Sequence, residues 1–318
     1  MRTLAALLAL SLASLAVQTP ANSQDGPPAW AYPVNPPNFQ RAADDGSTRR
    51  VPDSAAGYTL TQVRDLFAAP VWHPDDQPAM PDIVMKGRKP DVFACGVCHR
   101  SNGSGGPENA SLFGLSADYI IEQTMDFKNG QRTGSAPRVA MDLMIKLSKA
   151  TTDEELKQAA AYFASIKLRA NVTVMETDSV PKTHVRDLFL AALEGGEKEP
   201  IGRRIIEIPE NVDHFVSRDS RARFIAYVPP GSIEKGRALA TGGNPAVRCA
   251  TCHGANLEGT AVAPRLAARS PTYMFRQLYD YKSGARKGPK SALMKPVVEN
   301  LGTDEMIALV AYTASMKP

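Results

Sequence analysis

The chain has 318 residues, a length that allows two or three domains. An apolar content of 43% and a charged content of 22% are ordinary for a globular protein and exclude a largely disordered chain. The formal net charge of +4 is too small to indicate a nucleic-acid-binding protein.

The first element is an apolar run over Leu4–Val17 that follows a positively charged start at Arg2. It is shorter than the ~20 residues that a membrane-spanning helix needs. With the small polar stretch behind it, the run is typical of a secretory signal peptide, so we expect residues 1–23 to be removed. Cleavage at Ala16 and an uncleaved anchor are the alternatives. The mature protein is then exported to the periplasm without a transmembrane anchor.

Residues 24–80 form a Pro-rich segment, here called the N-terminal extension, that contains both tryptophans, Trp30 and Trp72. Proline fixes its own backbone angle and has no backbone N–H to donate, so this composition favours extended chain. We expect the extension to wrap around the unit that follows it.

The four cysteines occur only in two motifs, each a Cys-x-x-Cys pair followed directly by histidine. The motif residues are Cys95, Cys98 and His99, and Cys249, Cys252 and His253. C-x-x-C-H is the attachment signature of c-type heme. Two thiols about one helical turn apart add to the heme vinyl groups, and the adjacent histidine presents a ring nitrogen to the iron. The sequence therefore predicts two covalently attached heme c groups.

Three other interpretations of the cysteines explain less of the pattern. A structural zinc site would place its two Cys-x-x-Cys pairs about 15–20 residues apart, whereas 150 residues lie between Cys98 and Cys249. A redox dithiol or a pair of disulfides gives no reason for a histidine after both motifs.

The two motifs begin two copies of one repeated sequence. Cys95 aligns with Cys249 and Arg132 with Arg286 at a constant offset of 154, and the match resumes at an offset of 150 near the end of each copy. Such a repeat indicates two copies of one folded unit rather than a solenoid. We expect a first copy over residues 81–167 and a second copy over residues 231–318.

Each copy is predicted to be helical. Glycine stops at Gly130 and Gly284 end two amphipathic stretches, and acidic residues begin two closing helices. The expected helices cover residues 117–129, 153–166, 272–283 and 303–315, a short helix covers residues 81–87, and a helix over residues 232–240 has Ser232 as its N-cap.

Residues 168–230, here called the middle segment, separate the two copies. This segment is too long for an unstructured connection in a compact protein. The stretches 204–208 and 223–228 are rich in β-branched and aromatic residues, which predicts two short strands, paired as an antiparallel hairpin.

Each iron needs a sixth ligand, and methionine suits electron transfer because His/Met ligation raises the potential. In the second copy, only Met294 lies between the basic loop and the last helix. In the first copy, the C-terminal alignment selects Met144, whereas counting from the preceding arginine selects Met141. The expected iron ligands are His99 with Met144, and His253 with Met294.

Two C-x-x-C-H units, each followed by a G-x-R loop, a methionine and an A-x-x-Y helix, resemble class I cytochromes c, and their tandem arrangement is similar to the diheme cytochrome c-four group. The resemblance implies a mainly α protein with two tandem class I cytochrome c domains and a mixed inter-domain segment that carries a short β-hairpin. It also implies low-spin His/Met hemes and a helix crossing that brings Gly236 close to Tyr312. The N-terminal extension and the middle segment depart from this family.

Basic residues gather in the second copy, which has 12 Lys+Arg against 6 Asp+Glu. Lys282, Lys287 and Lys290 surround the loop before Met294, where they suit docking of an acidic redox protein, with a plain solvated face as the alternative. Arg132 and Arg286 suit heme propionates or a surface role. The remaining histidines, His73, His184 and His214, are expected on loops or in local hydrogen bonds.

These features predict an electron carrier rather than an enzyme, because a methionine in each copy closes both irons and no fifth cysteine exists. The expected protein is a periplasmic diheme cytochrome that moves single electrons between a donor dehydrogenase or respiratory complex and a terminal acceptor. Its partners are redox proteins. The alternatives are a diheme enzyme of the peroxidase or thiosulfate dehydrogenase type, and a fixed electron-transfer subunit of a dehydrogenase.

Overall fold

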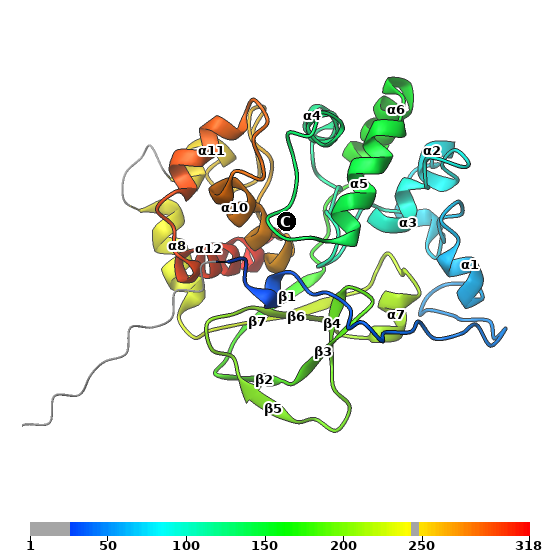
Figure 1. The fold of residues 1–318 in the computed structure, drawn as a ribbon, viewed down its shortest axis with the longest axis horizontal. Helices are drawn as coiled ribbons and strands as arrows, with labels where there is room; N and C mark the ends of the chain where they lie inside the picture. Colours follow the sequence, from blue (N-terminus) through cyan, green and yellow to red (C-terminus); the bar gives the residue numbers. More distant parts are fainter. Residues whose placement is uncertain (1–25, 243–247) are drawn as a thin grey trace, which may run out of the picture.

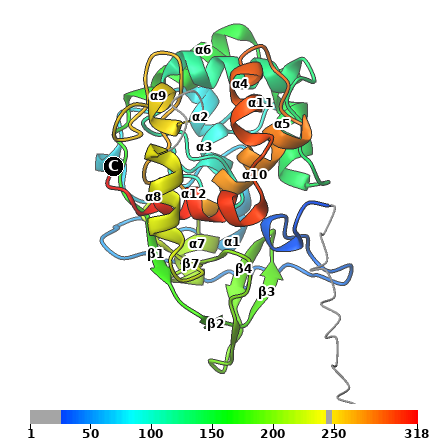
Figure 2. The same ribbon diagram turned by 90° about the vertical axis from the view of Figure 1, so that its left-hand side faces the viewer.

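The computed structural model describes residues 26–242 and 248–318. The predicted signal peptide over residues 1–23 lies outside the described residues. Within the described ranges, no helix has the length and apolar character needed to cross a bilayer. Two groups of helices lie side by side, and a small β region lies beneath them (Figures 1 and 2).

The helices of the two groups follow the internal repeat. The first copy contains α2 (Asp82–Met85), α3 (Cys95–His99), α4 (Ala117–Lys128), α5 (Val139–Ala150) and α6 (Asp153–Ser165). The second copy contains α8 (Ser232–Thr241), α9 (Cys249–His253), α10 (Pro271–Ser283), α11 (Ser291–Val298) and α12 (Thr303–Ser315). The six expected helices are present with small shifts at their ends, whereas α5 and α11 were not predicted.

The caps explain where these helices begin and end. The Ser116 hydroxyl accepts from the backbone of Tyr119 at the start of α4, and Ser270 caps α10 in the same way. The prediction for Ser232 was wrong, because Gly231 is the N-cap of α8 and Ser232 is its first residue. Gly231 has a φ of 77°, a left-handed conformation that glycine adopts without a steric cost.

The crossing of α8 with α12 is as the resemblance implied. A Cβ atom placed on Gly236 would lie 2.8 Å from the Tyr312 Cβ and closer still to the Ala308 carbonyl oxygen. Any side chain at this position would therefore push the two helices apart. The absence of a side chain lets the first and last helices of the second copy pack backbone to backbone.

The middle segment is more structured than predicted. Its strands are β1 (Val172–Glu176), β2 (Ser179–Pro181), β3 (Thr183–Arg186), β4 (Phe189–Ala192), β5 (Lys198–Pro200), β6 (Ile206–Pro209) and β7 (Phe224–Val228). The expected antiparallel pair is confirmed, with Ile206 opposite Tyr227. It is not a simple hairpin, because helix α7 (Val212–Val216) separates its strands and β1 adds in parallel to β7.

The N-terminal extension contains two 3-10 turns, η1 (Ala29–Ala31) and η2 (Pro74–Asp76), and helix α1 (Leu60–Arg64). We expected the extension to wrap around the first copy, but it also covers part of the second copy. The Trp30 ring lies 4.5 Å from that of Phe275 on α10, so this part covers the second copy. Farther along, Trp72 is buried and its Nε1 donates to the Ser217 carbonyl of the middle segment.

Asp76 ties the N-terminal extension to the middle segment. Its carboxylate accepts from Arg221 at 2.7 and 2.9 Å and pairs with Arg169 at 3.0 Å. The Asp76 side chain is 7% exposed. The hydrogen bonds from Arg221 lower the pKa of Asp76 to about 2.

We expect the stability contributed by Asp76 to be complete above about pH 5 and to be lost as the pH falls toward 2. The sign follows because the folded pKa lies below the unfolded value of about 3.9. Asp76→Asn should lower the free energy of unfolding at pH 6 by on the order of 1–3 kcal/mol. In denaturant titrations, the difference from wild type should shrink between pH 5 and pH 2. The exposed neighbour Asp75, changed to Asn, is the matched control, and a pH-independent difference at Asp76 would contradict the assignment.

Candidate heme-binding site

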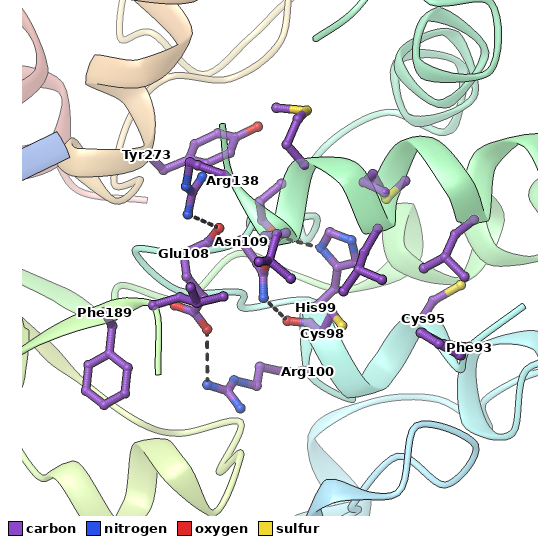
Figure 3. Close-up of a pocket in the computed structure, with 18 of the residues that line it drawn as sticks. Phe93, Cys95, Cys98, His99, Arg100, Glu108, Asn109, Arg138, Phe189 and Tyr273 are labelled. Carbon is purple, nitrogen blue, oxygen red and sulfur yellow. Dashed lines mark hydrogen bonds and ion pairs between the residues drawn. The ribbon is translucent and has the colours of Figure 1, made fainter. Parts of the chain in front are cut away.

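The first motif forms the short helix α3, which places Cys95, Cys98 and His99 along one and a half turns (Figure 3). His99 Nδ1 lies 2.8 Å from the Ala110 carbonyl oxygen. A carbonyl oxygen only accepts, so Nδ1 carries the proton and Nε2 keeps a free lone pair. This is the tautomer and the kind of outer hydrogen bond that orient a metal-ligating histidine.

The second motif repeats this geometry. His253 Nδ1 lies 2.6 Å from the carbonyl oxygen of Pro264, which occupies the position of Ala110 in the repeat. Burial lowers the pKa of both His99 and His253 and so favours the neutral ring, the form that binds a metal. Each motif therefore presents one neutral imidazole with an available Nε2.

Three of the four cysteines, Cys95, Cys98 and Cys249, are partly buried, and Cys252 is exposed. Burial raises the pKa of Cys95 to about 12 and also raises that of Cys98 and Cys249. All four cysteines lie in the described part of the chain and none of them forms a disulfide. This agrees with attachment sites and gives no support to the disulfide alternative.

A cavity of about 1190 Å³ lies against the first motif. Cys95, Cys98 and His99 line it, together with Met141 and Met144 from α5. The volume exceeds the ≈ 300–1,000 Å³ of ordinary small-molecule sites, and the donor set is two thiols, an imidazole and two thioethers. These residues fit a heme with His/Met ligation. Because both methionines reach the cavity, the choice between them stays a prediction.

In the second copy, Met294 lies on α11, the counterpart of α5, and is half-buried. His253 is buried at the end of α9. Residues 243–247, directly before the second motif, lie outside the described residues. The pairing of His253 with Met294 therefore stays a prediction.

Arg132 lies between the two copies and does not face solvent as a surface residue would. Its Nη1 donates to Gln123 Oε1 at 2.9 Å, and its Nη2 donates across the interface to Gln277 Oε1 at 2.8 Å and to the Tyr273 hydroxyl at 3.1 Å. Arg132 and the three partners also line the cavity. The Arg132 Nε atom is buried without a partner, so one donor is left for a heme carboxylate.

Arg286 makes the mirror arrangement. It donates to Gln277 in its own copy at 3.2 Å, and to Gln123 and the Tyr119 hydroxyl in the first copy. Arg132 and Arg286 also face each other as an antiparallel backbone bridge. The two G-x-R loops thus form one buried network that joins the copies, a role that the sequence did not predict.

The predicted basic patch is partly used inside the protein. Lys290 pairs with Glu122 of the first copy at 2.5 Å, and Lys282 donates to the Leu301 carbonyl at 2.6 Å. Lys287 is exposed, and its side chain has no hydrogen bond or ion pair within the described residues. Of the three predicted docking lysines, Lys287 is the most available to a partner.

The other histidines take structural positions. His73 is buried, and its Nε2 lies 3.0 Å from Asp219 Oδ1, so it takes the hydrogen-bonded alternative of the two that were expected. His214 lies 4.0 Å from the same carboxylate, and His184 is exposed on β3 at the cavity rim. Within the described ranges, no three His, Cys, Asp or Glu side chains gather as a metal cluster.

Sequence analysis missed several charged residues beside the first motif. Arg100, Glu108 and Arg138 line the cavity, and Figure 3 shows them next to His99. The Arg138 guanidinium donates to the Glu108 backbone carbonyl at 3.1 Å, and Glu108 Oε1 lies 3.7 Å from Arg100. One signal was available, because Arg100 stands where the second copy has Gly254.

A family model described as cytochrome c matches residues 233–317. Cytochrome c-554(548) of Halomonas halodenitrificans is 34% identical over 70 residues, which are 22% of this chain and 84% of that protein. Cytochrome c4 of Pseudomonas aeruginosa is 24% identical over 225 residues, which are 69% and 81% of the two chains.

A thiosulfate dehydrogenase electron acceptor of Stutzerimonas stutzeri is 45% identical over 78 residues, or 24% of this chain. The chain spans 35% of the length of that relative and 65% of cytochrome c4 from Azotobacter vinelandii. Among solved structures, reduced cytochrome c4 from Pseudomonas stutzeri is 22% identical, with a TM-score of 0.46 and coverage of 70% of this chain and 93% of that one.

Proposed function

Because the chain belongs to the cytochrome c family, with covalently bound heme c as its cofactor, we propose that it is an exported diheme electron carrier. It transfers single electrons in the periplasm between a donor dehydrogenase or respiratory complex and a terminal acceptor. The observation that carries this proposal is the repeated imidazole geometry, in which His99 and His253 each hold Nδ1 against a backbone carbonyl.

Two tandem class I cytochrome c domains, over residues 81–167 and 231–318, account for this repetition. The equivalent order of α3 to α6 and α9 to α12 supports the division. The N-terminal extension and the middle segment are additions that pack against both domains. The extension contacts the second domain through Trp30 and the first through the Leu66 carbonyl, which accepts from the Ala94 backbone N–H. In the middle segment, the Ser220 carbonyl accepts from Asn102 of the first domain, and Glu207 accepts from Ser270 of the second.

In each domain the chain would hold the heme through two thioether bonds and one imidazole. The attachment residues are Cys95 and Cys98 with His99, and Cys249 and Cys252 with His253. Met144 and Met294 are the proposed sixth ligands. The bound heme would supply a reversible one-electron couple, and a thioether as its second protein ligand would favour the ferrous state.

The surrounding residues orient the ligands and shield the first site from water. The Ala110 and Pro264 carbonyls fix the imidazole orientation. Buried apolar side chains such as Phe163 exclude water from the first site. The Arg132–Arg286 network holds the two copies in one arrangement, so that neither site must reorganise when its charge changes.

We expect two covalent hemes per chain, and the Cys95→Ser/Cys98→Ser double variant should retain one. A heme stain of the denatured protein, its mass and its alkaline pyridine spectrum measure the number directly. A redox titration of wild type should show two one-electron transitions, while the double variant should show one. One heme in the wild type, or zinc in place of iron, would refute the proposal.

Redox proteins are the proposed partners, and the name of the Stutzerimonas relative, an electron acceptor of a dehydrogenase, supports this class. A fixed subunit of a dehydrogenase is the second candidate, since another relative is the cytochrome subunit of sulfide dehydrogenase of Chlorobaculum tepidum. Docking of an acidic surface near Lys287 would steer encounter through complementary charge.

We expect Lys287→Glu to slow electron exchange with an acidic redox protein severalfold at low ionic strength. The difference should vanish at high salt, because the screening length at 1 M is only about 3 Å. Stopped-flow mixing with an acidic redox protein measures the rate. Lys198→Glu on β5 carries the same charge change away from the second copy and should leave the rate unchanged. A salt-independent wild-type rate would contradict docking by charge.

A further inference from the structure

The cavity beside the first motif continues into walls made by the N-terminal extension and the middle segment. Arg64 from the extension and Arg186 and Arg218 from the middle segment line this part. Among the described residues that line the whole cavity there are nine arginines, three carboxylates and no lysine. A heme carries only two propionates, so the wall keeps an excess of positive charge after the heme is placed.

Arg100 is the most deeply buried of these arginines near the motif. It follows His99 directly, is 2% exposed and lines the cavity. Its Nη1 is buried and has no hydrogen-bond partner. The nearest carboxylate oxygen belongs to Glu108 and lies 3.7 Å from Nη2, which is longer than a hydrogen bond. A buried guanidinium is costly unless it is paired, so this arrangement leaves room for an anion.

The backbone at Arg100 gives independent support. Its φ is +69°, in the left-handed region where L-residues are strained. The equivalent residue of the second copy is Gly254, with a φ of +87°, which has no such penalty. Strain of this kind gathers at functional sites. The first copy therefore has a large cationic side chain, Arg100, at the position where the second copy has a glycine.

Arg218 brings a second guanidinium to the cavity beside the first motif. Its Nη1 donates to the carbonyl of Val97, which lies between Cys95 and Cys98, and its Nε donates to the Val63 carbonyl. Neither partner is a carboxylate, so the positive charge of Arg218 is not neutralised by these contacts. The side chain is thus fixed against the attachment motif with its charge available to the cavity.

We propose that Arg100 and Arg218 bind a small dianionic oxyanion, of the size of sulfate, in the part of the cavity between the first motif and the middle segment. Guanidinium groups present two parallel N–H donors that match paired anionic oxygens. The occupant is a small diffusible anion because Arg100 is buried beneath the surface, beyond the reach of an acidic side chain on a docked protein.

The carboxylate of Glu108 should weaken anion binding at this site. Its Oε2 is buried without a partner and its charge opposes that of the proposed anion. Removing this charge with Glu108→Gln should tighten binding. An anion held beside α3 also stabilises ferric over ferrous heme, so binding and reduction must be linked reciprocally.

The test is calorimetric titration of the oxidised, heme-loaded protein with sodium sulfate at constant ionic strength. Wild type should bind one sulfate per chain, and Arg100→Gly should weaken binding at least tenfold. This variant gives the first copy the residue of the second and relieves the backbone strain, so it is expected to fold. Arg237→Gln removes an equal charge from an exposed pair with Glu234 on α8 and should change nothing.

Two further measurements fix the chemistry of the ligand. Perchlorate, a monoanion of similar shape, should bind much more weakly than sulfate. Sulfate should also lower the potential of one heme, and tenfold tighter binding to the oxidised form corresponds to about 59 mV. The proposal is overturned if wild type shows no stoichiometric sulfate binding at millimolar concentration, if Arg100→Gly binds as tightly as wild type, or if perchlorate binds equally well.

Discussion

Met294→His should lower the reduction potential of the second heme by on the order of 0.2 V, a part of the roughly 0.8 V range that axial ligands span. The reason is that imidazole stabilises ferric iron relative to a thioether, which favours the ferrous state. Spectroelectrochemical titration separates the two hemes, and the first should retain its potential. Met294 is half-buried on α11.

The neighbouring residue Leu293 offers the matched control. It is 66% exposed on the same helix, so Leu293→His should leave both potentials and the spectrum of the second heme unchanged. If the potential is insensitive to Met294→His, or if Leu293→His has the same effect, the proposed ligand is wrong.

The first heme allows the same test between two candidates. Met141 and Met144 lie one helical turn apart on α5 and both line the cavity. We expect Met144→Ala to abolish the methionine–iron charge-transfer band of this heme and Met141→Ala to preserve it. The opposite result would identify Met141 as the ligand and show that the alignment at an offset of 150 does not extend back to the methionine.

Local sequence signals were sufficient for the helices that begin and end with strong caps. Ser116 and Ser270 cap α4 and α10, and Thr152 begins α6 with a capping box to Glu155. The helices that contain the proposed methionine ligands, α5 and α11, lacked such signals. Neither Arg138 before α5 nor Lys290 before α11 provides a side-chain cap, and Pro296 lies inside α11. Tertiary packing around the heme sites, rather than propensity, selects these two helices.

The middle segment shows a different limit. Its predicted strands contain buried runs, with Ile206 and Phe224 both fully buried. The strands that were missed are three to five residues long, and some of them mix charged with apolar side chains, as in Thr183–Arg186. Their pairing depends on partners distant in sequence, such as the parallel alignment of Val172 with Phe224. Periodicity within a short window does not contain that information.

The residues of the heme-binding site also divide into those that the sequence predicted and those that it did not. The motif residues Cys95, Cys98 and His99 follow from spacing alone, because covalent attachment demands that spacing. The partners that Arg132 and Arg286 find in the opposite copy do not follow from it. The repeat showed that an arginine occurs at this position in both copies. It did not show which residues these arginines contact, because those contacts depend on how the two copies pack together.

Arg286→Met should be among the most destabilising single changes in the interface between the copies. The substitution removes the donors to Gln277, Gln123 and the Tyr119 hydroxyl, all in a buried setting. Each buried polar group left without a partner costs about 1–3 kcal/mol, so we expect a total loss of about 2–5 kcal/mol in the free energy of unfolding. Denaturant unfolding followed by circular dichroism measures this loss, and the exposed Arg237→Met is the control, expected to change stability by less than about 0.5 kcal/mol.

Arg132→Met should be similar in size, and the double variant should cost less than the two single losses added together. The two arginines share Gln123 and Gln277, so removing the first already breaks part of the network that the second supports. A double-mutant cycle gives the interaction energy directly. Strict additivity of the two losses would mean that each arginine stabilises only its own copy, and the buried network would then not be what holds the two copies together.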